Sequence, residues 1–130
     1  MRSFRPLAVL VVAGCTACRP PPPNDALRPN GAHWSCTRDR ALDTWSVCER
    51  VTADCEATAA AVRADAKAEG SPAEIEPCHL QPRAVCYTFH SDKAGNDNFM
   101  CYETPRDCEA GQRLAERSDY TNVSRCDEWE

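Results

Sequence analysis

The spacing of apolar residues changes along this chain from short strand-like runs to a helical period, and this predicts hairpins followed by helices. Trp34–Thr37 and Thr44–Cys48 are short runs with aromatic and β-branched residues, separated by the polar turn Arg38–Asp43, and such a pair is typical of a β-hairpin. Beyond them, small or apolar residues recur every three or four positions, at Cys55, Ala59, Val62 and Ala66. We expect this helix to have its N-cap at Thr52 and to stop at Gly70.

The same order occurs a second time further along the chain. Ala84–Phe89 and Asn98–Glu103 have strand character and are joined through Asp92–Asn96, where Asp at the first position and Gly at the fourth suit a type I turn followed by a bulge. A second helix is expected next, with Thr104 as its N-cap and Pro105 at its first position. An acidic residue three positions after the cap completes a pattern similar to a capping box.

The cysteines repeat with the same order. Eight of the ten cysteines form two sets of four, with 11, 6 and 22 intervening residues in the first set and 14, 6 and 17 in the second. Aligning Cys48–Ala57 with Cys101–Ala110 gives five identities in ten positions. The sequence therefore predicts an α+β fold, a small disulfide-rich domain of two tandem hairpin-plus-helix (ββα) repeats, residues 34–78 and 84–126. The eight cysteines are Cys36, Cys48, Cys55, Cys78, Cys86, Cys101, Cys108 and Cys126.

These eight cysteines are expected to form disulfides. Such a density in a short chain is typical of a protein outside the cytoplasm, where the bonds replace a core that the few bulky residues cannot build. We expect bonds only within each repeat, because each copy holds four cysteines around the same hairpin and helix. Three pairings remain open inside each repeat.

The N-terminus has the pattern of a targeting signal. Met1–Arg5 carries two arginines and Leu7–Gly14 is an uncharged apolar run, too short to span a bilayer and typical of a signal peptide. Val12–Cys15 (Val-Ala-Gly-Cys) resembles the lipobox of bacterial lipoproteins, which implies removal of residues 1–14 and lipidation of Cys15. An ordinary signal peptide cut near Cys18 is the alternative.

Residues 15–31 are expected to be a lipidated tether, and residues 32–130 the disulfide-rich domain. Four consecutive prolines, Pro20–Pro23, favour polyproline II, and residues 19–31 could then hold the domain up to ~40 Å from the bilayer. In the lipoprotein sorting rule an aspartate after the lipidated cysteine retains the protein at the inner membrane. Thr16 stands there, so the resemblance implies a cell-envelope protein anchored at the outer membrane.

Charge and composition limit the partners that we expect. Removing Arg2 and Arg5 with the signal lowers the formal charge from −5 to −7, which argues against nucleic acid as a charge-driven partner. The expected partners are the membrane, through the lipid anchor, and another envelope protein.

No catalytic constellation, cofactor or metal site is predicted. His33, His79 and His90 fall in predicted loops without shared spacing and are expected to be solvated. Asp92 and Asn96–Asn98 could offer oxygen ligands to calcium, but they lack EF-hand spacing, and we interpret them as a polar hairpin turn.

Two further resemblances bear on function. Trp34–Cys36, the two Asp-Cys-Glu-Ala segments and Tyr120–Cys126 resemble cysteine-rich lipoproteins that occur as paralogous families in some high-GC bacterial genomes, and this resemblance implies no particular activity. Gly95–Phe99 and the helix after it faintly resemble the hairpin-to-helix segment of Kunitz-type inhibitors, although Gln112 stands where that family has a helix cysteine.

The leading hypothesis is a lipid-anchored, non-enzymatic binding module, without a specified ligand. The alternative is a protease inhibitor or toxin-like domain, which predicts an exposed, extended loop over Phe89–Phe99.

Overall fold

The computed structural model describes residues 19–43 and 45–130. In the first half of the chain, three antiparallel strands form a sheet in the order β2-β1-β3, with a helix between the second and third strands. A short 3-10 helix, η2 (Asp25–Leu27), precedes them. The elements are β1 (Trp34–Arg38), β2 (Ser46–Glu49), α1 (Thr52–Glu69) and β3 (His79–Gln81).

The second half has a second antiparallel sheet, in which β4 is the central strand. It pairs with β5 along one edge and with two short strands, β6 and β7, along the other. These elements are β4 (Ala84–Ser91), β5 (Asn96–Tyr102), α2 (Pro105–Glu116), β6 (Tyr120–Thr121) and β7 (Asp127–Trp129). The predicted α+β class is confirmed, as two helices and two antiparallel sheets with four disulfides.

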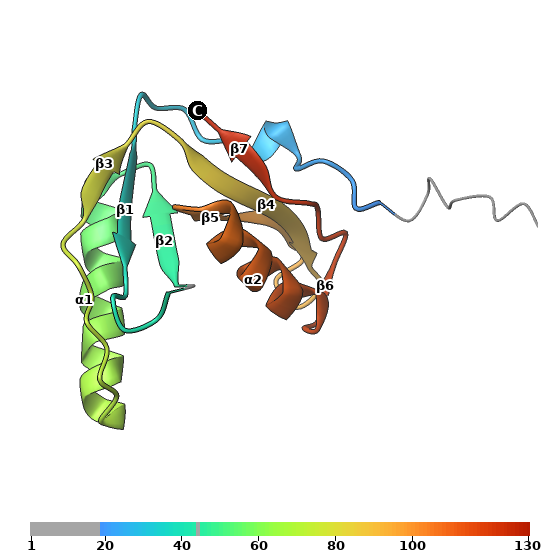
Figure 1. Cartoon of the computed structure of the whole chain (residues 1–130). Helices are drawn as coiled ribbons and strands as arrows, with labels where there is room; N and C mark the ends of the chain where they lie inside the picture. Colours follow the sequence, from blue (N-terminus) through green and yellow to red (C-terminus); the bar gives the residue numbers. More distant parts are fainter. Residues whose placement is uncertain (1–18, 44) are drawn as a thin grey trace, which may run out of the picture.

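The two sheets lie side by side, with β2 close to β5, and each sheet carries its own helix (Figure 1). Helix α1 packs on β1 and β2 and extends beyond the end of the sheet, whereas α2 lies across β4 and β5. Within the described residues, no helix is long and apolar enough to cross a membrane.

Local sequence accounts for two of the helix ends but not for the start of α1. Thr104 accepts a hydrogen bond from the Asp107 amide at 3.2 Å, which confirms the predicted N-cap. Gly70 ends α1 with φ of 67°, and its N–H donates to the last carbonyls of the helix. Thr52, however, is the first residue of α1 and not its cap; Val51 holds the cap position without any side-chain bond. The predicted Thr52 cap is therefore wrong.

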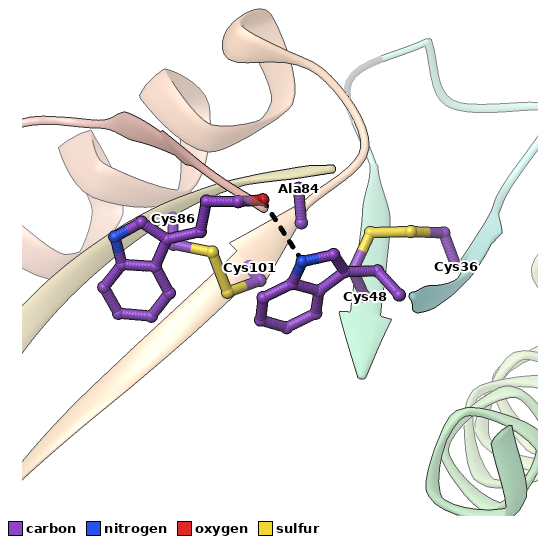
Figure 2. Packing of buried hydrophobic residues seen from close by; sticks show 7 residues of the cluster. Cys36, Cys48, Ala84, Cys86 and Cys101 are labelled. Carbon is purple, nitrogen blue, oxygen red and sulfur yellow. Dashed lines mark hydrogen bonds between the residues drawn. A yellow bond between two sulfur atoms is a disulfide. The ribbon is translucent and has the colours of Figure 1, made fainter. Parts of the chain in front are cut away.

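One core cluster joins the two sheets (Figure 2). It contains the disulfides Cys36–Cys48 and Cys86–Cys101 together with Ala84, all almost inaccessible to solvent. Two tryptophans complete it: Trp34 at the start of β1 donates its indole N–H to the carbonyl oxygen of Trp129 in β7, at 3.2 Å. This cluster is therefore built largely from cystine and tryptophan, contributed by both halves of the chain.

A second cluster lies beneath α2 and makes the two helices unequal. Tyr87 and Phe89 of β4 pack with Tyr102 of β5 against Cys108 and Ala115 of the helix. Among the described residues no comparable aromatic layer packs on helix α1, and its two buried residues are Cys55 and Ala59. The 18-residue helix α1 is therefore held by a small contact area and a disulfide.

The proline-rich segment lies along the domain. The Pro21 carbonyl accepts a hydrogen bond from the Arg125 amide at 2.8 Å, the Asn24 amide donates to the Thr88 hydroxyl at 2.9 Å, and Pro23 is buried. The expectation of a free spacer across this whole segment is therefore wrong. Prolines lack a donor but keep their carbonyl acceptors, so an extended proline segment can still dock on exposed amides.

Candidate functional site

All eight domain cysteines are paired, and each bond joins two cysteines of the same half. In both halves the first cysteine bonds the second across a hairpin, and the third bonds the fourth from the helix to the returning chain. This pattern selects one of the three pairings left open in each predicted repeat. The bonds are Cys36–Cys48, Cys55–Cys78, Cys86–Cys101 and Cys108–Cys126. The predicted lipidation residue Cys15, and Cys18, lie outside the described residues.

The histidines differ from expectation. His79 and His90 lie in strands, not loops, and each contacts a carboxylate: His79 Nε2 is 2.8 Å from Glu103, and His90 Nδ1 is 2.7 Å from Asp97. His33 lies in a loop as predicted. Among residues 19–43 and 45–130, no group of three metal-ligating side chains is assembled.

The Phe89–Phe99 segment does not form the extended loop that the inhibitor alternative predicts. Phe89 pairs with Asn98 and Thr88 with Phe99 in the β4–β5 ladder, which leaves only a tight turn at the tip. Phe89 is itself buried against Tyr120, with ring centroids 4.4 Å apart. An inhibitory loop must offer free backbone groups to a protease, and in this segment the groups that face across the β4–β5 ladder are already used within the hairpin.

A cluster of charged and polar side chains, which sequence reasoning did not find, lies where the two halves meet. Glu103, after β5, accepts hydrogen bonds from His79 and from Gln81 of β3, the latter at 3.1 Å. Its second oxygen is 3.4 Å from the Arg38 guanidinium. We call this group the polar cluster; it consists of Arg38, Ser46, His79, Gln81, Glu103 and Asp107.

The buried half of the polar cluster has the wrong geometry for nucleophilic catalysis. The Ser46 hydroxyl donates to Asp107 at 2.7 Å and accepts from the Glu103 amide at 2.9 Å. Ser46 is 1 % exposed, and its partner is a carboxylate and not an imidazole, since His79 is bonded to Glu103. With Arg38 3.5 Å from Asp107, the arrangement neutralises a buried carboxylate and ties the first sheet to α2. Such a network makes the contact between these two elements rigid.

A different surface has the character of a binding site. Beside α1 lies an apolar pocket of about 200 Å³ that is open to solvent. Its walls are the turn between β1 and β2, one side of α1 and the segment that follows α1. We call it the Trp45 pocket; it is lined by Asp39, Leu42, Trp45, Val62, Asp65, Ala66, Glu69, Ser71 and Ala73.

Local backbone geometry places the two large apolar side chains of this pocket. The Leu42 amide donates to the Asp39 carbonyl and the Trp45 amide to the Leu42 carbonyl, each at 3.2 Å, so successive tight turns present both residues on the same side. Leu42 is 57 % exposed and Trp45 is half-buried. Leu42 lies in a segment that the sequence predicts to be a polar turn. In the sequence, only Trp45, a few residues later, could have indicated an apolar surface at this place.

Comparison of the chain with protein-family models, with curated proteins and with solved structures finds no match.

Proposed function

We propose that this protein is a lipid-anchored, non-enzymatic binding module of the bacterial cell envelope. The observation that carries the proposal is the pairing of all eight domain cysteines. The same chain has, at its N-terminus, a sequence that resembles a lipobox. Disulfides of this number are stable in oxidising compartments. In a lipoprotein, Cys15 would then be reserved for acylation while the eight later cysteines hold the domain together.

The proposal includes an internal duplication of one disulfide-stapled unit. In each sheet the central cysteine lies opposite a cysteine on one neighbouring strand and opposite the residue after the fourth cysteine on the other. These pairs are Cys36 with Cys48 and His79, and Cys86 with Cys101 and Asp127. The two sheets thus have the same strand register around the same pattern of disulfides. This similarity supports the two tandem ββα repeats that the cysteine spacing predicts, each with an added third strand.

The contacts of the proline-rich segment orient the domain in this proposal. Because Pro21 is bonded to Arg125, only the residues from Cys15 to Pro21 separate the anchor from the domain, a reach of roughly 20 Å. The described chain starts beside β4 and β6, and α1 lies on the opposite side of the molecule (Figure 1). The domain would therefore sit near the bilayer with α1 and the Trp45 pocket directed away from it.

Replacing the acceptor cysteine tests the anchor. Cys15→Ser should leave an unprocessed precursor that carries no acyl chain, whereas Cys18→Ser, the matched control, should be processed and remain membrane-bound after salt washing. Fractionation of the native host with immunoblotting distinguishes the two outcomes. Release of the Cys15→Ser protein at the normal mature size would contradict the proposal.

A further inference from the structure

Among the exposed features of this domain, the Trp45 pocket combines apolar surface, a rigid frame and charge of one sign. We infer that it binds a segment of a protein partner that inserts one bulky apolar side chain flanked by lysine or arginine. This inference rests on the proposed function, because it needs the domain outside the cytoplasm with α1 directed away from the bilayer.

The frame of the pocket is held by hydrogen bonds that do not depend on a ligand. Asp39 is 4 % exposed, and its Oδ1 accepts from the Ala41 amide at 2.8 Å and from the Glu74 amide at 2.9 Å. The Arg40 amide donates to the Glu74 carbonyl at 2.9 Å. One buried carboxylate thus fixes the turn and the segment after α1 to each other, and a preformed site loses less entropy on binding.

The apolar side chains of the pocket come from α1 and from the turn between β1 and β2. Val62 and Ala66 lie one helical turn apart on α1 and face the Leu42 and Trp45 side of the pocket. Trp34 and Trp129 are fully buried, whereas Trp45 is half-buried. Tryptophan is enriched among the residues that contribute most to the binding energy of protein interfaces.

The size of the pocket argues for a side chain as its occupant. Pockets for cofactors and drug-sized ligands enclose roughly 300–1,000 Å³, and this one measures about 200 Å³. That space suits one large aliphatic or aromatic side chain, with the flanking peptide lying across the rim.

Charge specifies what flanks that side chain. Three of the lining residues are acids and none is a cation. Asp39 is buried and bonded to backbone amides, so the exposed Asp65 and Glu69 supply the charge of the rim. The nearby arginines are engaged elsewhere: Arg40 bonds Glu76 at 2.6 Å, and Arg63 donates to backbone carbonyls of the segment after α1. The rim is therefore negative and complements a basic partner segment.

Site-specific photocrosslinking in native envelopes tests the inference with the full, anchored chain. p-Benzoylphenylalanine replaces Leu42 at the pocket or, as the matched control, Leu114, which is 66 % exposed on α2. Tandem mass spectrometry then identifies the partner peptide. We expect adducts at the Leu42 position, in a segment with a bulky apolar residue beside Lys or Arg, and none of that kind at Leu114.

The second part of the crosslinking test reverses two charges on α1. Asp65→Lys with Glu69→Lys should reduce the Leu42 adduct about tenfold or more, since a lost interfacial charge pair costs about that factor, while membrane fractionation and the four disulfides stay unchanged. No adduct at Leu42 in a correctly anchored protein, an adduct in an acidic segment, or an adduct insensitive to charge reversal would each overturn the inference. The Cys15→Ser test of anchoring is independent of all three results.

Discussion

Two threonines near the starts of the two helices differ in what they contribute. Thr104 caps α2, whereas Thr52 makes no capping bond at the start of α1. Thr104→Ala should lower the free energy of unfolding by about 1 kcal/mol. Thr52→Ala, its matched control, should change it by less than about 0.5 kcal/mol. Urea titration of both variants measures the difference, and equal losses would mean that the capping hydrogen bond at Thr104 contributes nothing.

Gly111 is required by close packing within α2. A Cβ atom there would overlap the Tyr102 hydroxyl, and Tyr102 is stacked on Tyr87 in the second core cluster. Alanine usually stabilises a helix interior by up to about 1 kcal/mol relative to glycine, but overpacking costs about 1–3 kcal/mol. Gly111→Ala should therefore destabilise the domain in thermal unfolding. Adding Tyr102→Leu, which removes the ring carbon as well as the hydroxyl that the new Cβ would meet, should recover part of the loss, and purely additive effects would contradict the assigned contact.

Glu49 at the end of β2 makes stability depend on pH. Burial raises the pKa of its carboxyl above the usual value, and the Asp54 carboxylate adds to the rise. A group whose pKa is raised on folding stabilises the folded state at acid pH, below about 4.3, and loses that contribution as pH rises through the folded pKa.

Glu49→Gln removes this pH-dependent penalty. The variant should unfold at a temperature a few degrees higher than the parent chain at pH 7, with no advantage near pH 3. Circular dichroism melts across that range measure the difference, and a variant that is less stable at pH 7 would show that the charged carboxylate is stabilising.

Helix α1 depends on its disulfide more than α2 does. α1 buries Cys55 and Ala59, whereas α2 packs on an aromatic layer. Removing the Cys55–Cys78 bond with paired alanines should cost about 3 kcal/mol in the chain-entropy model and should abolish hydrogen-exchange protection in the last two turns of α1. The equivalent change at Cys108–Cys126 should leave α2 protected. Retained protection in α1 would show that its side-chain contacts suffice.

The elements that the sequence predicts are those with a strong local signal. Both hairpins follow from alternation around polar turns, and α2 from Thr104 and Pro105 at its start. Strands β3 and β7 were missed because they are three residues long and form only where the disulfide-linked chain returns to the central strand. Whether such strands form depends on pairing partners elsewhere in the chain, so no local sequence pattern predicts them.

The candidate sites were less accessible to sequence reasoning. The polar cluster draws its residues from β1, β2, β3, α2 and the end of β5, and the spacing between them carries no motif. The Trp45 pocket was hidden in the same way, because Leu42 belongs to a turn that reads as polar. Only folding brings α1 and the segment after it against that turn.

At the scale of the whole molecule, the two halves form one body. Trp34 and Trp129 come from opposite ends of the domain sequence and share a core and a hydrogen bond, and Ser46 and Asp107 join the first sheet to the second helix. If the domain arose by duplication, as we propose, these contacts would have been added afterwards, and they now join two units of similar topology. One consequence is a rigid body whose far side, at α1, differs from the side next to the anchor.

Mass spectrometry of the protein extracted from native membranes without reduction tests the lipid anchor and the disulfide pairing in one measurement. We expect a mature chain that begins at Cys15, carries two or three acyl chains, and contains the four bonds Cys36–Cys48, Cys55–Cys78, Cys86–Cys101 and Cys108–Cys126. A chain that starts elsewhere without lipid, or a bond that joins residues 36–78 to residues 86–126, would contradict this expectation.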